Sequence, residues 1–371
     1  MTKDNVQGSH VERRGGHLDE GLCVRRLPEE LGAEMAPSAG PCFAEKTLYP
    51  LEKRRARILA LGDVGMNLLL GLRLLGGDVF SEIGICDLNE NQILRLEREI
   101  NQIRWPFAED EGDADAGLPA WAAPSMPEVR AVSEDELFNG DVFIFCASKG
   151  VPDLSQKGDV RMAQLEANRG LIRHFGELAD RAQYQGLVCV VSDPVDPLCA
   201  AFLDASHLRP GQIQGYGLGV MHARALYYAE KNPQWSRYLT EGRAYGPHGE
   251  DLVLADSLEH YDDAASRALT EKTAHANMEV RELGFKPYLA PAFSSAALSI
   301  LLTLRGRWHY GSVYIGDTDR GAFFGVKNRL RKGAVWELDD PEVPETLYQR
   351  LKAAYLHLAE LRFPKAESES E

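Results

Sequence analysis

Residues 57–87 read RILALGDVGMNLLLGLRLLGGDVFSEIGICD, and their pattern indicates the fold class of the chain. It begins with a short, mainly apolar run that predicts a strand, and Gly62 and Gly65 follow directly. The next residues are apolar on nearly every side, which predicts a helix buried against a sheet. Two adjacent glycines end this helix, because glycine readily takes the left-handed conformation found at helix C-termini. A second apolar run then predicts a strand with Asp87 at its carboxyl end.

The order of strand, glycine turn, helix, strand and acid is that of the dinucleotide-binding βαβ unit. Glycines let backbone amides approach a diphosphate, and the start of the helix adds a positive dipole end. The acid stands 22 residues after Gly65, where it suits ribose hydroxyls and repels a 2′-phosphate, so the unit favours NAD over NADP. We expect the cofactor to contact the glycine turn and two further strand ends, namely Gly62, Asp63, Val64, Gly65, Asp87, Cys146 and Ala147.

One position of the usual three-glycine fingerprint differs, because its first glycine is Ala60 here. Alanine is the mildest replacement, so we expect the phosphate cradle to be kept. Two glycines alone also fit an ordinary crossover in which glycine only permits close packing. The buried helix and Asp87 favour the cofactor site over that alternative.

Composition narrows the class of protein. The chain has 371 residues, 44% of them hydrophobic, which predicts a globular protein of two domains. Its net charge of −15 argues against nonspecific binding to nucleic acid or to an anionic membrane. No apolar run approaches the roughly 20 residues that cross a bilayer, and the N-terminal residues contain no apolar core of a secretory signal. The six cysteines form no CxxC pair, so we expect a reduced, cytoplasmic protein without a disulfide framework or a metal site.

We divide the chain into three parts. Residues 1–53 form an extension rich in Gly, Pro and charge, for which we expect partial disorder and one short helix near residues 28–35. Residues 54–205 form a Rossmann-type NAD-binding domain, a doubly wound parallel sheet with helices on both faces, because strands and helices alternate. Its later elements are a helix capped by Asn89, a solvated acidic insertion at 107–127, a strand at 141–147, a helix at 160–183 and a strand at 187–192.

The third part, residues 206–371, changes character and predicts a mixed α+β substrate domain. Its predicted elements are a glycine-rich strand at 215–219, a helix at 220–231, two strands joined by a loop with His248, a long helix at 256–283, a helix after Pro291, short strands near 311–315 and 322–326, and a helix at 344–362.

Four places beyond the cofactor unit carry side chains suited to chemistry. Arg161 stands seven residues before Asn168, Asp193 lies in SDPVDP, Arg224 lies in GLGVMHARALYYAE and His248 lies in GPHGED. The four candidates are 32, 31 and 24 residues apart. In this order and spacing the sequence resembles the lactate/malate dehydrogenase family, from about residue 58 to residue 361. The resemblance implies NAD-dependent interconversion of a 2-hydroxy acid and a 2-keto acid, a small carboxylate as substrate, and a homodimer or homotetramer.

The resemblance also implies a role for each of these residues. His248 matches the family's general acid/base, a task that suits imidazole because it exchanges protons near neutral pH. Arg224 matches the arginine that grips the substrate carboxylate with two parallel hydrogen bonds. Arg161 matches the arginine on a mobile loop that polarises the carbonyl group when the loop closes.

Two departures from the family concern the acid/base. The family pairs its histidine with an aspartate one helical turn before the clamp arginine, and that position is Met221 here. The family's strand-end asparagine is Asp193. A carboxylate there either favours NAD⁺ and repels a substrate carboxylate, or takes over as the partner of His248.

Further departures concern specificity. Ser155 stands six residues before Arg161, where malate-type members have an arginine, and this argues against an ordinary malate enzyme. Lys157 still offers a positive charge nearby. Lys286 stands near a small substrate-facing hydroxyl of the family, where it either balances Asp193 or points to solvent.

Two other functions stay open. Because of Met221 and Asp193, the chain is alternatively a family member that binds NAD(H) with lost or weak catalysis and acts as a sensor or interaction protein. A metal- and NAD-dependent glycosidase of related fold is the third hypothesis. It needs a Cys/His metal pair after the glycine-rich strand, and His222 has no such neighbour among residues 219–221.

Overall fold

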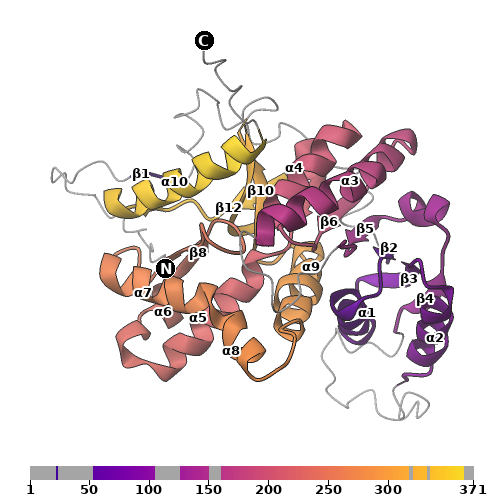
Figure 1. Ribbon diagram of the computed structural model, residues 1–371, viewed down its shortest axis with the longest axis horizontal. Helices are drawn as coiled ribbons and strands as arrows, with labels where there is room; N and C mark the ends of the chain where they lie inside the picture. The colour runs from indigo at the N-terminus through magenta and orange to yellow at the C-terminus, as the bar shows by residue number, and fades with distance from the viewer. Residues whose placement is uncertain are drawn as a thin grey trace, which may run out of the picture.

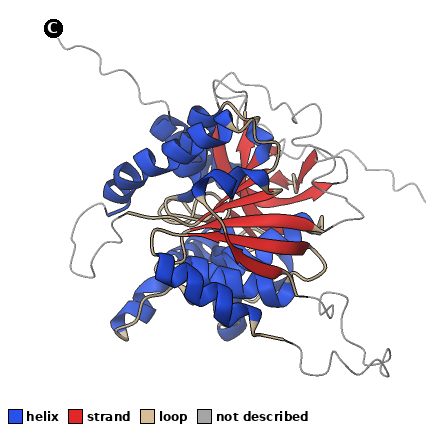
Figure 2. Ribbon diagram, turned by 90° about the vertical axis from the view of Figure 1, so that its right-hand side faces the viewer, coloured by secondary structure: helices blue, strands red, loops and turns tan. Residues whose placement is uncertain are grey.

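Parallel strands form the part of the fold that positions the candidate site. The computed structural model describes residues 22–23, 53–104, 126–149, 160–316, 321–331 and 335–362. Within these ranges the central sheet, whose strands are red in Figure 2, has the order β12-β11-β10-β7-β6-β5-β2-β3-β4. Its parallel strands are β2 (Arg54–Leu59), β3 (Phe80–Cys86), β4 (Glu128–Ala131), β5 (Val142–Phe145), β6 (Leu187–Val190) and β7 (Ile213–Gly215). Strand β2 has β3 on one side and β5 on the other, so the sheet is doubly wound as predicted.

The sheet continues past the predicted boundary at residue 205. Strand β7 joins the parallel strands, and β10 pairs antiparallel to it. The antiparallel strands that follow are β10 (His309–Ile315), β11 (Ala322–Arg331) and β12 (Val335–Leu338). The strands predicted near 311–315 and 322–326 are therefore confirmed and are longer than the sequence indicated.

Helices cover both faces of the parallel strands (Figures 1 and 2). One face packs against α1 (Asp63–Leu75), α2 (Glu90–Asn101), the π-helical segment η7 (Pro291–Ala297) and α9 (Leu298–Leu304). The other face packs against α3 (Val160–Arg181) and α4 (Val195–Ser206). Side chains of a strand alternate between these two cores, as the buried runs of β5 and β6 require.

The remaining elements complete the second half. The pair β8 (Arg243–Tyr245) and β9 (Val253–Ala255) is antiparallel, with His248 in its loop as predicted. Helix α10 (Glu345–Arg362) packs on β11, and its Tyr355 hydroxyl donates a 2.9 Å hydrogen bond to the Ile315 carbonyl. Shorter elements are β1 (Leu22–Cys23) paired with β13 (Glu342–Val343), and the single turns η4 (Glu134–Asn139), η5 (Pro210–Gln212), η6 (Pro233–Trp235) and α6 (Tyr238–Glu241).

Two predicted elements were wrong in their bounds. The stretch at 215–219 is a strand-to-helix turn, because β7 ends at Gly215 and α5 (Leu218–Lys231) already begins at Leu218. The long helix at 256–283 is two helices, α7 (Asp263–Ala274) and α8 (Ala276–Glu282). Asp262 starts α7 by accepting a 3.0 Å hydrogen bond from the Ala265 amide, and the chain leaves α7 at His275.

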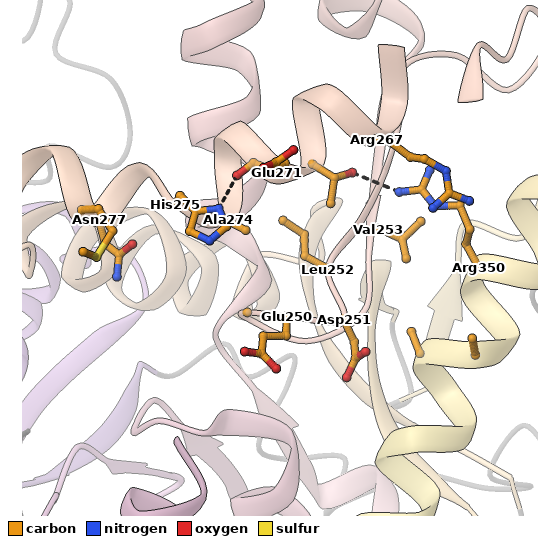
Figure 3. Close-up of a pocket in the computed structure, with 15 residues that line it drawn as sticks. Glu250, Asp251, Leu252, Val253, Arg267, Glu271, Ala274, His275, Asn277 and Arg350 are labelled. Carbon is orange, nitrogen blue, oxygen red and sulfur yellow. Dashed lines mark hydrogen bonds between the residues drawn. The ribbon is translucent and has the colours of Figure 1, made fainter. Parts of the chain in front are cut away.

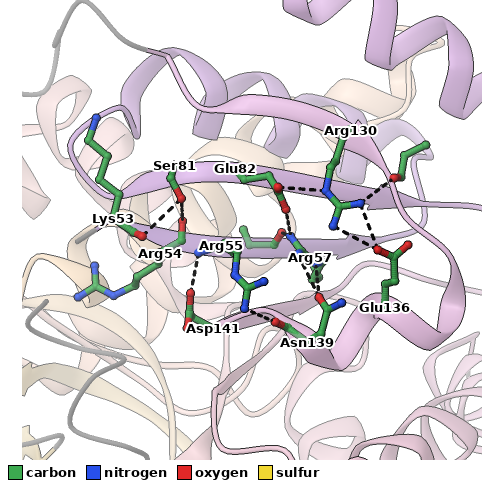
Figure 4. A network of polar contacts seen from close by, with 12 residues as sticks. Lys53, Arg54, Arg55, Arg57, Ser81, Glu82, Arg130, Glu136, Asn139 and Asp141 are labelled. Carbon is green, nitrogen blue, oxygen red and sulfur yellow. Dashed lines mark hydrogen bonds and ion pairs between the residues drawn. The ribbon is translucent and has the colours of Figure 1, made fainter.

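A buried arginine interrupts the apolar pattern of β2. Arg57 is fully buried, and its guanidinium contacts Glu82 at 2.7 Å and the Asn139 side-chain oxygen at 3.0 Å (Figure 4). Arg130 joins the same network through a 3.0 Å ion pair with Glu82. A Cβ on Gly84 would lie 2.8 Å from the Arg57 side chain, so glycine makes room for it. Burial lowers the pKa of Arg57, and the Glu82 carboxylate opposes that shift.

Several predictions fall outside the described residues. These are most of the extension with its helix near 28–35, nearly all of the acidic insertion at 107–127, Ser155, Lys157 and the side chain of Arg161. The backbone at position 161 is helical, as predicted, because α3 begins at Val160. Among the described helices, none is long and apolar enough to cross a membrane.

Candidate active site

The glycine turn after β2 lies where the order in which successive strands are added to the sheet reverses direction. Strand β2 has β3 on one side and β5 on the other, and such a switch point forms the ligand crevice of doubly wound folds. A Cβ on Gly65 would lie 2.0 Å from the Ala60 carbonyl oxygen and 3.5 Å from Cβ of Cys146. Helix α1 therefore approaches the strand ends this closely only because position 65 is glycine.

Ala60 keeps the backbone geometry of the glycine it replaces. Its φ is 73°, in the left-handed region that side chains with a Cβ disfavour by roughly 1–2 kcal/mol. The Ala60 amide donates a 2.8 Å hydrogen bond to the Cys86 carbonyl, which holds the turn against β3. The turn thus retains its shape with alanine, and the cost is stored in the backbone.

The start of α1 is open to a ligand. Gly62 is the N-cap residue, and no side chain caps the helix. A Cβ added to Gly62 meets nothing within 4 Å, so space adjoins the first helical turn, which begins with Asp63 and Val64. An uncapped helix N-terminus beside open space fits the negative charge of a diphosphate.

Asp87 holds the turn from the neighbouring strand. Its carboxylate accepts hydrogen bonds from the Leu61 amide at 2.6 Å and from the Asn89 amide at 2.9 Å. One bond to each oxygen leaves acceptor capacity on both, since a carboxylate offers about four lone-pair sites. The residue is half-buried at the end of β3, which fits contact with ribose hydroxyls.

Asn168 joins the ends of β5 and β6. Its fully buried side chain accepts a 2.6 Å hydrogen bond from the Lys149 amide and donates a 3.0 Å bond to the Asp193 carbonyl. Ser192 adds a 2.7 Å bond to the carbonyl of Ala147. The strand ends that carry Ala147 and Asp193 are therefore held together by side chains.

His248 and Asp193 form a pair. The His248 Nδ1 lies 3.0 Å from Asp193 Oδ1, although 55 residues separate them in the sequence. The side chains are 20% and 44% exposed, so the pair opens to solvent. A Cβ on Gly217 would lie 2.9 Å from Cβ of His248, so the start of α5 also packs closely on the loop. The sequence left two alternatives for Asp193. The 3.0 Å contact agrees with the one in which Asp193 is the partner of His248.

Arg224 lies on α5, the helix whose N-cap Gly217 packs against His248. Burial lowers the pKa of Arg224, and the negative charge of Asp193 opposes that shift. Its Nη1 contacts the Met221 sulfur at 3.6 Å. Met221 itself is fully buried among apolar side chains, and sulfur offers His248 no counter-charge.

Segment η7 packs against both α5, which carries Arg224, and α1, which follows the glycine turn. Its Ser295 hydroxyl donates to the Gly217 carbonyl at 2.7 Å and accepts from the Val220 amide at 2.8 Å. On its other side, a Cβ on Gly71 of α1 would lie 2.7 Å from Cβ of Ala297. The sequence gives no signal for this role of Ser295, because its partners are 75 or more residues away.

The structure also places Lys286 and His222, which the sequence singled out. Lys286 points largely to solvent, with its side chain 70% exposed, and its Nζ lies 3.6 Å from Asp63 Oδ2. His222 lies 2.9 Å from the Tyr238 hydroxyl through Nδ1, and burial lowers its pKa to about 4. Within the described residues, no group of three or more metal-binding side chains occurs.

A cavity of about 690 Å³ lies behind the His248 loop (Figure 3). Residues 249–253 form one wall, and α7, α8 and α10 form the others. Its polar residues include Glu271 and Arg350, and Arg350 is bonded to the Tyr261 hydroxyl at 2.8 Å. His248 and Arg224 do not line this cavity, so it is separate from the candidate chemistry.

Known proteins of the same fold are lactate and malate dehydrogenases. Malate dehydrogenase from Picrophilus torridus superimposes with a TM-score of 0.65 at 17% identity, covering 84% of this chain and 97% of that chain. Lactate dehydrogenase from Cryptosporidium parvum, solved with lactic acid and nicotinamide adenine dinucleotide, superimposes with a TM-score of 0.65 at 15% identity, covering 84% and 98%. These likenesses confirm the predicted fold class.

Curated relatives point the same way. L-lactate dehydrogenase from Treponema denticola is 27% identical over 208 residues, which are 56% of this chain and 58% of the relative. That from Mesomycoplasma hyopneumoniae is 24% identical over 204 residues, or 54% and 56%. The chain thus spans a little over half the length of the curated relatives it matches. No family model matches the sequence.

In fold and in sequence, the chain is thus similar to lactate and malate dehydrogenases, whose doubly wound Rossmann-type fold it shares.

Proposed function

We propose that the protein is an NAD-dependent oxidoreductase that interconverts a 2-hydroxy acid and a 2-keto acid. The observation that carries this proposal is the 3.0 Å contact between His248 and Asp193, which supplies the acid/base with a carboxylate despite Met221. Arg224 lies on α5, whose N-cap Gly217 packs against His248, and its guanidinium would bind a small carboxylic acid through two parallel hydrogen bonds.

The cradle residues fit a dinucleotide. The uncapped start of α1, with Gly62, Asp63, Val64 and Gly65, would hold the diphosphate, and Asp87 would bind ribose hydroxyls. Cys146 and Ala147 would line the same crevice from the end of β5. When bound, NADH supplies the hydride for the carbonyl carbon.

The remaining steps belong to side chains. His248 uses Nδ1 for Asp193, which leaves Nε2 as the ring nitrogen that exchanges a proton with the substrate oxygen. Asp193 orients the ring and balances the positive charge that forms on it. Arg224 would bind the substrate carboxylate, and Arg161 would polarise the carbonyl group.

A screen of 2-keto acids for NADH oxidation tests the proposal. We expect at least one acid to be reduced, with a rate that falls about 10²–10⁴-fold in His248→Ala, because that is the usual contribution of general acid–base catalysis. Arg224→Lys should raise KM for the same acid, since an ammonium lacks the paired donors of guanidinium. Turnover unchanged by His248→Ala would contradict the assignment.

Met221 favours a second candidate, a family member that binds NAD(H) with weak or lost catalysis and acts as a sensor or interaction protein. NADH binding without turnover of any 2-keto acid would support it over the first. For either candidate we propose a cytoplasmic homodimer or homotetramer, which light scattering of the purified chain tests.

A further inference from the structure

We propose that Lys286 is a ligand of the cofactor's diphosphate, supplied by the second half of the chain and kept in position by Asp63. The inference rests on the proposed NAD(H) binding and deepens it. It gives the cradle a charged side chain beyond the backbone amides and glycines of the turn.

The contact bridges two distant parts of the chain at the cradle itself. Asp63 is the first residue of α1, next to Gly62, where space adjoins the helix start. Lys286 follows α8 and precedes η7, and its Nζ lies 3.6 Å from Asp63 Oδ2. Because η7 packs on α1 through Gly71, the loop that carries Lys286 has an anchor on the same helix.

Charge explains why the pair belongs to cofactor binding. Asp63 places a negative charge at the helix N-terminus where a diphosphate would bring two more. The Asp63 carboxylate and the diphosphate would repel each other, and the neighbouring ammonium of Lys286 offsets that repulsion. Without Lys286, the Asp63 carboxylate would offset part of the positive potential at the start of α1 and would repel the diphosphate that this potential attracts.

The geometry leaves the lysine available to a phosphate. A separation of 3.6 Å exceeds the 2.7–3.2 Å typical of an N–H···O hydrogen bond, so the contact is an ion pair rather than a hydrogen bond. The Lys286 and Asp63 side chains are 70% and 48% exposed, so rotation of the lysine side chain meets little packing. Its ammonium can thus turn from the carboxylate to a phosphate oxygen without movement of the backbone.

Binding measurements on three probes test the proposal. NADH and ADP-ribose carry the diphosphate, and adenosine carries no phosphate. We expect Lys286→Met to raise Kd for NADH and ADP-ribose about tenfold, the effect of losing one hydrogen bond to a charged group, and to leave Kd for adenosine unchanged. Lys272→Met is the matched control, because Lys272 is also an exposed lysine paired with a carboxylate, that of Glu279.

Asp63→Asn separates the two charges. We expect this variant to bind NADH several-fold more tightly than wild type, because a negative charge beside the diphosphate is gone. Lys286→Met should still weaken binding in the Asp63→Asn background, since the phosphate and not the carboxylate is then its partner.

The outcomes distinguish this inference from the function on which it rests. A wild-type chain that binds no NADH overturns both. NADH binding by wild type with a Kd that Lys286→Met changes less than twofold overturns the role of Lys286 alone. An equal loss for adenosine and ADP-ribose also overturns it, because the lysine would then act through the fold and not through phosphate.

Discussion

Replacing Ala60 with glycine should stabilise the folded protein. Ala60 has a φ of 73°, which glycine adopts about as readily as a negative φ. Relieving the left-handed conformation returns roughly 1–2 kcal/mol. The extra backbone freedom of glycine in the unfolded chain costs about 0.5–1 kcal/mol. We therefore expect Ala60→Gly to raise the free energy of unfolding by about 0.5–1 kcal/mol.

Ala56→Gly is the matched control, since it makes the same change four residues earlier, inside strand β2. Ala56 is fully buried, and no positive φ occurs there. This variant gains no relief, pays the same entropy cost and loses a buried methyl group worth about 0.8 kcal/mol. We expect it to lower the free energy of unfolding by about 1.5 kcal/mol.

Urea unfolding followed by circular dichroism measures both variants. The midpoint of Ala60→Gly should lie above that of wild type, and the midpoint of Ala56→Gly should lie below it, with equal slopes. A midpoint for Ala60→Gly that falls as far as that of Ala56→Gly would refute the argument, because the turn would then hold no strain for glycine to relieve.

Three further predictions concern the site and its surroundings. Asp193→Asn should lower kcat about 10²–10⁴-fold in the keto-acid assay, whereas Asp180→Asn, the same change at an exposed Asp–His pair, should leave it unaltered. Gly65→Ala should abolish NADH binding in fluorescence titrations, because its Cβ would lie 2.0 Å from the Ala60 carbonyl oxygen. Burial raises the pKa of Asp196 to about 7, so the folded state binds more protons than the unfolded chain between pH 4 and 7, and stability falls as pH rises through that window. Asp196→Asn should therefore raise the urea midpoint at pH 8 and have little effect at pH 4; equal effects at both would contradict this.

Local patterns made the cofactor unit readable from the sequence. The glycines, the apolar helix and the acid of residues 57–87 each depend on neighbours a few positions away, and β2, α1 and β3 follow them closely. The two wrong boundaries also have local causes. Glycines at 215–219 fit a strand or a turn equally, and the cap at Asp262 has a side chain that is as common in loops.

Contacts across the fold were beyond the sequence. The sequence offered the pairing of Asp193 with His248 as one of two alternatives, and spacing alone could not choose between them. The sequence places Arg57 in a mainly apolar strand and does not show that Glu82 of β3 and Asn139 of η4 contact it. Lys286 had no visible link to Asp63, because only the packing of η7 on α1 brings them together.

The carboxylate that pairs with the candidate acid/base stands at another position in the sequence than the family pattern has it. The family pattern has an acid one helical turn before the clamp arginine, and this chain has Met221 there. The His248 imidazole instead contacts Asp193, which follows the end of a strand. A comparison with the family at position 221 alone would therefore miss the carboxylate that lies beside His248.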